Sequence, residues 1–155
     1  MTAILFVCLG NICRSPTAEA VFRGRASSSG FAVHVDSAGT AAWHVGKAPD
    51  ARAQAAGAAR GYELAHLRAR QVTREDFAAF DYVLAMDHEN LAALKALAPP
   101  GERDKVQLML SFAPHVRRQA VPDPYYGGDE GFDEVLDLVE AASDGLIRTL
   151  REKQS

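Results

Sequence analysis

The stretch "LFVCLGNICRSPTAEAVF", residues Leu5–Phe22, contains an apolar run, a short polar loop and the start of a helical pattern. The apolar run begins at Ala3 and ends at Cys8, and such a run is typical of a strand buried on both faces of a parallel sheet. Pro16 suits the first turn of a helix, and Ser15 is a favourable N-cap residue before it. The stretch therefore predicts a strand, a tight loop and a helix in succession.

The predicted loop holds both cysteines of the chain, Cys8 and Cys13, and Arg14 follows directly. Three kinds of site use such residues: a metal-binding site with cysteine ligands, a redox pair of cysteines, and a nucleophilic cysteine beside a bound anion. Two cysteines supply only half of the tetrahedral shell that zinc needs, which disfavours the metal site. The other two interpretations stay open at this point.

Apolar and alternating runs elsewhere predict three more strands, with helical patterns between and after them. Strands that alternate with helices predict an α/β fold, a three-layer sandwich with a central four-stranded parallel sheet flanked by helices. The chain has no internal repeat and no long linker, so we expect a single domain over residues 1–155. The further strands are expected at residues 31–39, 80–87 and 105–111, and the further helices at 50–60, from Thr73, at 88–98 and at 133–153.

The 155-residue chain has an ordinary composition for a globular protein, with 48% apolar and 24% charged residues. Its net charge of −3 argues against a nucleic-acid-binding surface, although a local basic pocket is compatible with it. The sequence lacks a basic leader and any apolar run near the ~20 residues that cross a bilayer, so we expect no membrane partner. Two closely spaced cysteines do not brace a secreted domain, which favours a cytoplasmic location with reduced thiols.

A loop between a strand end and a helix start suits an oxyanion, because backbone N–H groups and the helix dipole converge there. Cys8 ends its predicted strand, and parallel sheets bind ligands at the carboxyl ends of their strands. Gly10 allows a tight turn, and the planar guanidinium of Arg14 can hold two phosphate oxygens. The same positive field favours the thiolate of Cys8 as a nucleophile, and the Ser15 hydroxyl can donate to its sulfur.

The spacing C-x-x-x-x-x-R-S is the signature of cysteine-dependent phosphatases, and "VCLGNICRSP" closely resembles the low-molecular-weight protein tyrosine phosphatases. The resemblance implies that phosphotyrosine and aryl phosphates are hydrolysed through a phosphocysteine on Cys8, with Arg14 binding the phosphoryl group. It implies neither a metal nor a cofactor, because the loop and the arginine neutralise the phosphate charge. The implied phosphate-binding loop consists of Leu9, Gly10, Asn11, Ile12, Cys13, Arg14 and Ser15.

A second motif, "PDPYYGG" at residues Pro122–Gly128, offers the acid that cleavage of a phosphate ester needs. Asp123 lies between two prolines, which stiffen the backbone on either side of it. The resemblance implies that Asp123 protonates the leaving oxygen and that Tyr125 and Tyr126 form walls for an aromatic substrate. A plain turn before the last helix is the alternative for this motif alone. Paired with the opening loop, the motif favours Asp123 as general acid and base.

The resemblance extends over nearly the whole chain and implies roles for further residues. Ser37, in "DSAGT", would bind the phosphate loop through Asn11, and His66 would support the same hydrogen-bond network. Trp43 would lie at the rim of the site, where it contacts the substrate ring, and Ile12 would also contact the substrate. The alternatives are an ordinary turn serine, a partly buried tryptophan and a structural histidine.

The implied partners are phosphotyrosine-containing proteins, with a bacterial tyrosine kinase among the candidate substrates. Phosphate and vanadate-like oxyanions are expected to inhibit. The resemblance also implies that Cys13 is a redox partner of Cys8, because the family uses such a disulfide for reversible inactivation. The alternative for Cys13 is a small apolar side chain in the core.

Three other functions are compatible with this scaffold. An arsenate reductase relays electrons through further cysteines, and this chain has none after Cys13. A protein-arginine phosphatase carries threonine at the position of Ile12, and an apolar Ile12 is better suited to an aromatic ring. An inactive phosphopeptide-binding module is expected to lack the nucleophile or the acid, whereas Cys8 and Asp123 are both present.

Overall fold

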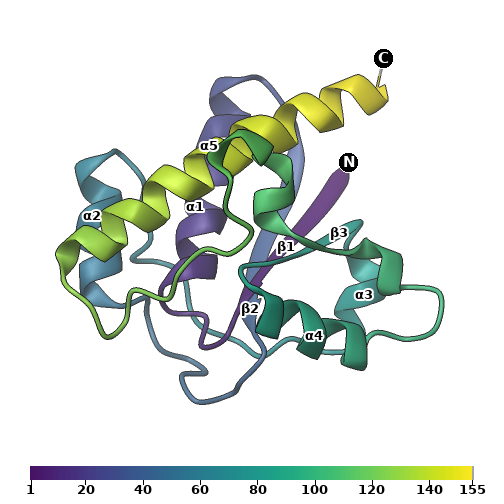
Figure 1. Ribbon diagram of the computed structural model, residues 1–155, viewed down its shortest axis with the longest axis horizontal. Coiled ribbons are helices and arrows are strands. Elements are labelled where there is room, and N and C mark those ends of the chain that lie inside the picture. Colours follow the sequence, from purple (N-terminus) through teal and green to yellow (C-terminus); the bar gives the residue numbers. More distant parts are fainter. Residues whose placement is uncertain (155) are drawn as a thin grey trace.

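A four-stranded parallel sheet in the order β2–β1–β3–β4 forms the middle layer of the computed structural model, which describes residues 1–154 (Figure 1). The α/β class and the four parallel strands predicted from the sequence are confirmed. The strands are β1 (Thr2–Cys8), β2 (Val33–Gly39), β3 (Tyr82–Ala85) and β4 (Val106–Leu108). The helices are α1 (Arg14–Ser28), α2 (Ala51–Ala59), α3 (Asp76–Ala79), α4 (His88–Leu97) and α5 (Asp129–Gln154), and short 3₁₀ turns cover Arg103–Lys105, Met109–Phe112 and Pro114–Val116.

Helices cover both faces of the sheet, which makes the fold a three-layer sandwich (Figure 1). On one face, α1 and α5 pack over the sheet, and Phe6 of β1 contacts Phe22 of α1 with ring centroids 5.7 Å apart. On the other face, Val7 of β1 shares an apolar cluster with Phe77 of α3 and Leu94 of α4. Strand β1 is therefore buried on both sides, which explains its continuous apolar sequence. Within residues 1–154, none of the helices has the length and apolar character needed to cross a membrane.

The order of the strands places a crevice at the end of β1. The chain passes from β1 through α1 to β2 on one side, and it later adds β3 on the other side of β1. Ligands bind in such sheets at the carboxyl ends of the strands, where the strand order reverses. Cys8 pairs with Gly39 at this edge, and a Cβ on Gly39 would stand 2.7 Å from the Leu9 carbonyl oxygen. The absence of a side chain at Gly39 therefore lets the loop after β1 lie close to β2.

The boundaries of several elements differ from the sequence predictions. Helix α1 begins at Arg14 with Cys13 at the N-cap, so the prediction that Ser15 caps this helix is wrong. Ser15 lies inside the first turn, and its hydroxyl contacts the sulfur of Cys8 instead of capping a backbone N–H. The fourth strand ends at Leu108, and the chain then turns in a 3₁₀ helix. Strand β2 begins at Val33 rather than 31, β3 spans Tyr82–Ala85 rather than 80–87, α3 begins at Asp76 rather than Thr73, and α5 begins at Asp129 rather than 133.

Gly145 of α5 packs closely against the turn at Met109–Phe112, and a substitution there tests this packing. A Cβ at this position would overlap the carbonyl oxygen of Phe112. We expect Gly145→Ala to lower the free energy of unfolding by about 1–3 kcal/mol, because backbone atoms must move to admit the methyl group. Chemical denaturation followed by circular dichroism measures this change.

Gly24→Ala in α1 is the matched control for that substitution. Its Cβ would meet the Tyr62 ring at 3.5 Å, an ordinary contact, and alanine is favoured over glycine in helices by up to about 1 kcal/mol. Gly24→Ala is therefore expected to leave the stability unchanged or to raise it. A Gly145→Ala variant as stable as Gly24→Ala would contradict the described packing.

Candidate active site

The loop of residues 9–13 curls around the sulfur of Cys8. The backbone N–H of Asn11 points to Cys8 Sγ at 3.3 Å, and the Ser15 hydroxyl lies 3.0 Å from the same sulfur. Asn11 has a left-handed backbone, with φ of 57°, which only a few non-glycine residues tolerate. This turn aims a backbone N–H group into the concavity and leaves Cys8 at its base.

Three hydrogen bonds of the Asn11 side chain hold this left-handed turn in place. Its amide nitrogen donates to Ser15 Oγ at 2.7 Å and to Ser37 Oγ at 3.0 Å, and its amide oxygen accepts from the Arg70 N–H at 3.0 Å. A left-handed residue costs about 1–2 kcal/mol. Each hydrogen bond contributes about 0.5–1.5 kcal/mol, so the three together are sufficient to offset a strain of this size.

The Arg70 backbone also determines which atom donates in the hydrogen bond between Ser15 and Cys8. A backbone N–H can only donate, so the Asn11 oxygen must face Arg70 and the Asn11 nitrogen must face Ser15. Ser15 Oγ therefore accepts from Asn11, and the Ser15 hydrogen is free for Cys8 Sγ at 3.0 Å. The Ala38 carbonyl oxygen is a weaker acceptor at 3.4 Å. The hydroxyl is thus placed to stabilise negative charge on the sulfur.

Ser37 occupies the position expected for it, and it connects the loop to a buried carboxylate. Ser37 donates to Glu19 Oε1 at 2.7 Å, and Arg23 Nη2 pairs with Glu19 Oε2 at 2.6 Å. Sequence reasoning missed Glu19 and Arg70 as supports of the loop. Glu19 leaves a signal, a charged residue within an apolar helical run, whereas Arg70 acts on the loop through its backbone and leaves none.

Arg14 extends from the first turn of α1 to the far side of the pocket, where it is held by groups from two other segments. Its Nη1 donates to Asp87 Oδ2 at 2.6 Å and to the Val121 carbonyl at 3.0 Å. Burial by itself would lower the pKa of the Arg14 guanidinium, but the Cys8 sulfur and the Asp87 carboxylate raise that pKa above its ordinary value. Arg14 is therefore a fixed positive charge beside the nucleophile.

Sequence reasoning also missed Asp87, although its position was informative. Asp87 follows β3, the neighbour of β1, so it reaches the same edge of the sheet as Cys8. One carboxylate oxygen accepts from Arg14, and the other caps α4 by accepting from the Asn90 N–H at 2.8 Å. The orientation of Arg14 is thereby tied to the start of α4.

Asp123 faces the phosphate loop from the segment that precedes α5. Its Oδ2 lies 3.9 Å from Arg14 Nη2, and its Oδ1 accepts from the Tyr125 N–H at 3.0 Å. The Asp123 side chain is 43% exposed, so it remains accessible to a leaving group or to water. The structure thus brings together Cys8, Arg14 and Asp123, as the sequence predicted, across more than a hundred residues of chain.

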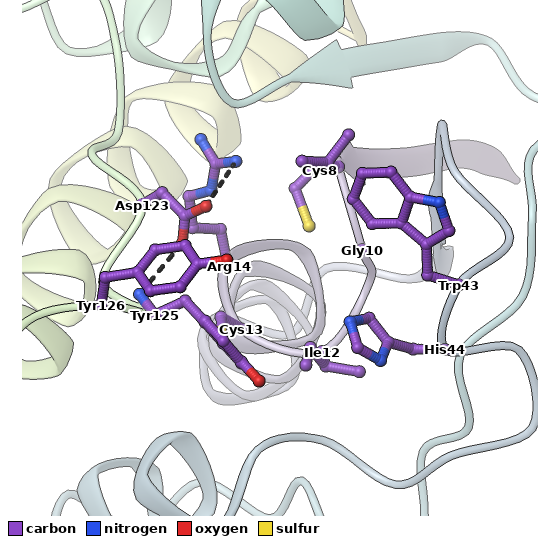
Figure 2. A pocket seen from close by; sticks show the side chains of 11 residues that line it. Cys8, Gly10, Ile12, Cys13, Arg14, Trp43, His44, Asp123, Tyr125 and Tyr126 are labelled. Carbon is purple, nitrogen blue, oxygen red and sulfur yellow. Dashed lines mark hydrogen bonds and ion pairs between the residues drawn. The ribbon is translucent and has the colours of Figure 1, made fainter.

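One pocket contains these three residues and the predicted aromatic contacts. Figure 2 shows Trp43 and His44 on one side of the pocket and Asp123, Tyr125 and Tyr126 on the other, with the Cys8 sulfur between them. The aromatic rim is open, because Trp43 is 70% and Tyr126 is 93% exposed. The pocket is lined by Cys8, Leu9, Gly10, Ile12, Cys13, Arg14, Trp43, His44, Asp123, Tyr125 and Tyr126.

His66 is the one predicted site residue that the structure does not bring to the others. It is exposed, and none of the hydrogen bonds described for residues 1–154 involves its ring. The support expected from His66 comes instead from the Arg70 N–H, which bonds to the Asn11 side chain. The segment after α2 therefore holds the phosphate loop through its backbone and not through the histidine.

Cys13 differs sharply from Cys8 in its surroundings. Its side chain joins an apolar cluster that includes Ala53 and Phe132, and both cysteines carry free thiols. Burial raises the pKa of Cys13 to about 12, and the charge of Asp50 adds to this effect. Cys13 is therefore a neutral thiol at neutral pH. Within residues 1–154, no group of three His, Cys, Asp or Glu side chains is arranged to bind a metal ion.

Known proteins resemble this chain in sequence and in fold. A low molecular weight protein-tyrosine-phosphatase of Streptomyces coelicolor is 51% identical over 156 residues, covering 97% of this chain and 94% of the relative. The crystal structure of a protein tyrosine phosphatase from Entamoeba histolytica has a TM-score of 0.96 and 40% identity, and it covers 100% of both chains. A Drosophila arginine phosphatase, at 32% identity and a TM-score of 0.90 over 97% of this chain and 98% of its own, has the same fold.

A family model described as low molecular weight phosphotyrosine protein phosphatase matches residues 3–155 of this sequence. The match includes the loop around Cys8 and the segment that carries Asp123, and the curated relatives are named as protein-tyrosine-phosphatases. This chain therefore belongs to the low molecular weight phosphotyrosine protein phosphatase family, whose members are enzymes.

Proposed function

We propose that the chain hydrolyses phosphotyrosine in proteins, and aryl phosphates in general, through a phosphocysteine on Cys8. The observation that carries this proposal is the position of the Cys8 sulfur. It has the Asn11 N–H and the Ser15 hydroxyl beside it, and it faces Arg14 and Asp123 in one pocket. Donors aimed at developing negative charge are a major source of rate enhancement in phosphoryl transfer.

In the first step, the Cys8 thiolate attacks phosphorus, and the bond between phosphorus and the phenolic oxygen breaks. Asp123 gives its proton to that oxygen, and Arg14 and the N–H groups of residues 9–15 bind the phosphoryl oxygens. In the second step, the Asp123 carboxylate takes a proton from water, whose oxygen attacks phosphorus. The sulfur–phosphorus bond breaks and leaves inorganic phosphate and the thiolate, which the Ser15 hydroxyl stabilises.

The apolar side chain of Ile12 supports phosphotyrosine over phosphoarginine as the substrate, and the aromatic rim suits a phenyl ring. Ile12 lines the pocket beside Cys8, and Trp43, Tyr125 and Tyr126 surround its opening. Apolar and aromatic groups stabilise a phenyl ring, whereas a guanidinium group needs polar partners that Ile12 does not supply.

The remaining parts of the proposal concern the setting of the enzyme. We take residues 1–155 as one catalytic domain, which the single sheet and the family match support. A cytoplasmic location is consistent with the need for a reduced Cys8. The proposed partners are phosphotyrosine-containing proteins, with a bacterial tyrosine kinase as one candidate. Phosphate and vanadate are proposed as competitive inhibitors, because they fit the same donors.

The first prediction concerns the nucleophile. We expect Cys8→Ser to reduce hydrolysis of p-nitrophenyl phosphate to background, because a serine hydroxyl is not ionised in this loop, while inorganic phosphate still binds. Steady-state kinetics and isothermal titration with phosphate measure the two properties. Cys13→Ser, in the same loop, is expected to retain turnover. Near-normal activity of Cys8→Ser would show that Cys8 is not the nucleophile.

The second prediction concerns the acid. We expect Asp123→Ala to lower kcat/KM for phenyl phosphate by about 10²–10⁴-fold, the usual contribution of a general acid. The loss for p-nitrophenyl phosphate is expected to be much smaller, because its leaving group needs little protonation. Asp129→Ala removes an exposed carboxylate from the start of α5 and should have no such effect. Equal losses on both substrates would exclude Asp123 as the acid.

The third prediction concerns the redox role proposed for Cys13. Peroxide oxidises thiolates, so the neutral Cys13 is not the first cysteine to react. Cys8 is oxidised to a sulfenic acid. The Cys13 thiol then attacks the Cys8 sulfur, and the sulfenic oxygen leaves as water when the disulfide forms. After mild peroxide treatment, mass spectrometry should find a Cys8–Cys13 bridge, and a thiol reductant should restore activity. In Cys13→Ser, the oxidation should become irreversible. Equal recovery of both proteins would rule out the protective role.

A further inference from the structure

Arg52, in the first turn of α2, contacts the loop that carries Asp123 and is linked to the phosphate loop through Asp50. On one side it pairs with Asp50: Nε donates to Asp50 Oδ1 and Nη2 to Asp50 Oδ2, each at 3.1 Å. The backbone N–H of Asp50 in turn donates to the carbonyl oxygen of Ile12 at 2.8 Å. The Arg52 guanidinium is therefore fixed relative to the phosphate loop.

On its other side, Arg52 binds the acid loop, the segment Pro122–Gly128 that carries Asp123. Its Nη2 donates to the Tyr125 carbonyl at 2.9 Å, and its Nη1 donates to the Gly127 carbonyl at 3.4 Å. The guanidinium carbon also lies 5.6 Å from the centre of the Tyr125 ring and 4.7 Å from that of Phe132, both within the range of cation–π attraction. One planar cation thus binds backbone and aromatic groups of the acid loop and the Phe132 ring at the start of α5.

The peptide units of Tyr125 link Arg52 to the acid. The Tyr125 N–H donates to Asp123 Oδ1 at 3.0 Å, while the Tyr125 carbonyl accepts from Arg52. The same short segment carries the exposed Tyr126, Gly127 and Gly128, which pack little against the rest of the protein. Hydrogen bonds from residues outside this segment are therefore important for holding the Asp123 carboxylate in position.

We propose that Arg52 is a positioning residue for proton transfer, which holds the Asp123 carboxylate at the right place relative to Cys8. This inference rests on the proposed function of Asp123. Arg52 is not among the residues that line the pocket. It acts by linking the acid loop, through Asp50, to the phosphate loop. Without it, the acid loop keeps its sequence and its aspartate but loses its fixed distance to the nucleophile.

Arg60 provides a matched control, because it is an arginine at the other end of α2. It pairs with Asp137 at 2.9 Å and with Glu140 at 2.7 Å, so it ties α2 to α5 without contacting the acid loop. Arg60→Ala therefore removes a comparable ion pair from the same helix. A loss of activity caused by general loosening of α2 should be shared by Arg52→Ala and Arg60→Ala.

The first measurement is kcat/KM for phenyl phosphate and for p-nitrophenyl phosphate in the two arginine variants. Misplacing a catalytic group by about 1 Å can cost on the order of 10²-fold in rate. For Arg52→Ala we expect the loss on phenyl phosphate to exceed that on p-nitrophenyl phosphate by about tenfold, since only the former needs the acid. Arg60→Ala should show no such difference. Equal behaviour of the two variants, with melting temperatures like that of the wild type, would overturn the proposal.

The second measurement is a double-mutant cycle with Asp123→Ala. If Arg52 acts through Asp123, then Arg52→Ala has no further leaving-group-dependent effect once the acid is gone. An unchanged tenfold difference in the Asp123→Ala background would show that Arg52 acts by another route. Arg52→Lys keeps the positive charge but has one donor nitrogen in place of three, so it should show only part of the Arg52→Ala loss on phenyl phosphate.

The two proposals fail in different ways. If Asp123→Ala itself shows no dependence on the leaving group, the role of Asp123 is wrong. If Asp123→Ala shows the dependence and Arg52→Ala does not, only the positioning role of Arg52 is wrong.

Discussion

The left-handed turn at Asn11 is the constraint on which the site depends. It turns the loop after β1 back over Cys8, so that the Asn11 N–H and the Ser15 hydroxyl both meet the sulfur. The turn is costly in itself, and the Asn11 amide offsets that cost by bonding to three separate segments of the chain. The geometry of the nucleophile is therefore a property of the whole fold and not of the loop alone.

The sheet explains why those segments meet. Strand β1 lies between β2 and β3, and the carboxyl ends of all three strands point to one edge. β1 delivers Cys8 to this edge, β2 delivers Ser37 near its end, and β3 leads directly to Asp87, which holds Arg14. The last connection brings Asp123 to the same place from the far end of the sequence. A buried sheet with short strands thus assembles charges and donors that are remote in the chain.

Much of this could be predicted from the residues. The apolar run to Cys8 gave a strand buried on both faces, and the strand–loop–helix order with Arg14 predicted the anion site and its place at the sheet edge. Residues that act through the backbone escaped prediction, as at Arg70, because no side-chain pattern marks them. Ser15 lies inside the first turn of α1 and not at its N-cap, because the helix begins one residue earlier, at Arg14. His66 is exposed, and the Arg70 N–H bonds to Asn11 in its place.

The central claim is that a covalent phosphoryl group forms on Cys8 during turnover. Its most direct test is a rapid acid quench of the Asp123→Ala variant mixed with p-nitrophenyl phosphate. This leaving group departs without the acid, whereas loss of the base slows hydrolysis of the intermediate. Peptide mapping by mass spectrometry should then find the phosphoryl group on the peptide that contains Cys8, and on Cys8 itself after fragmentation. Release of phosphate without any phosphorylated Cys8, or with the group on another residue, would contradict the account.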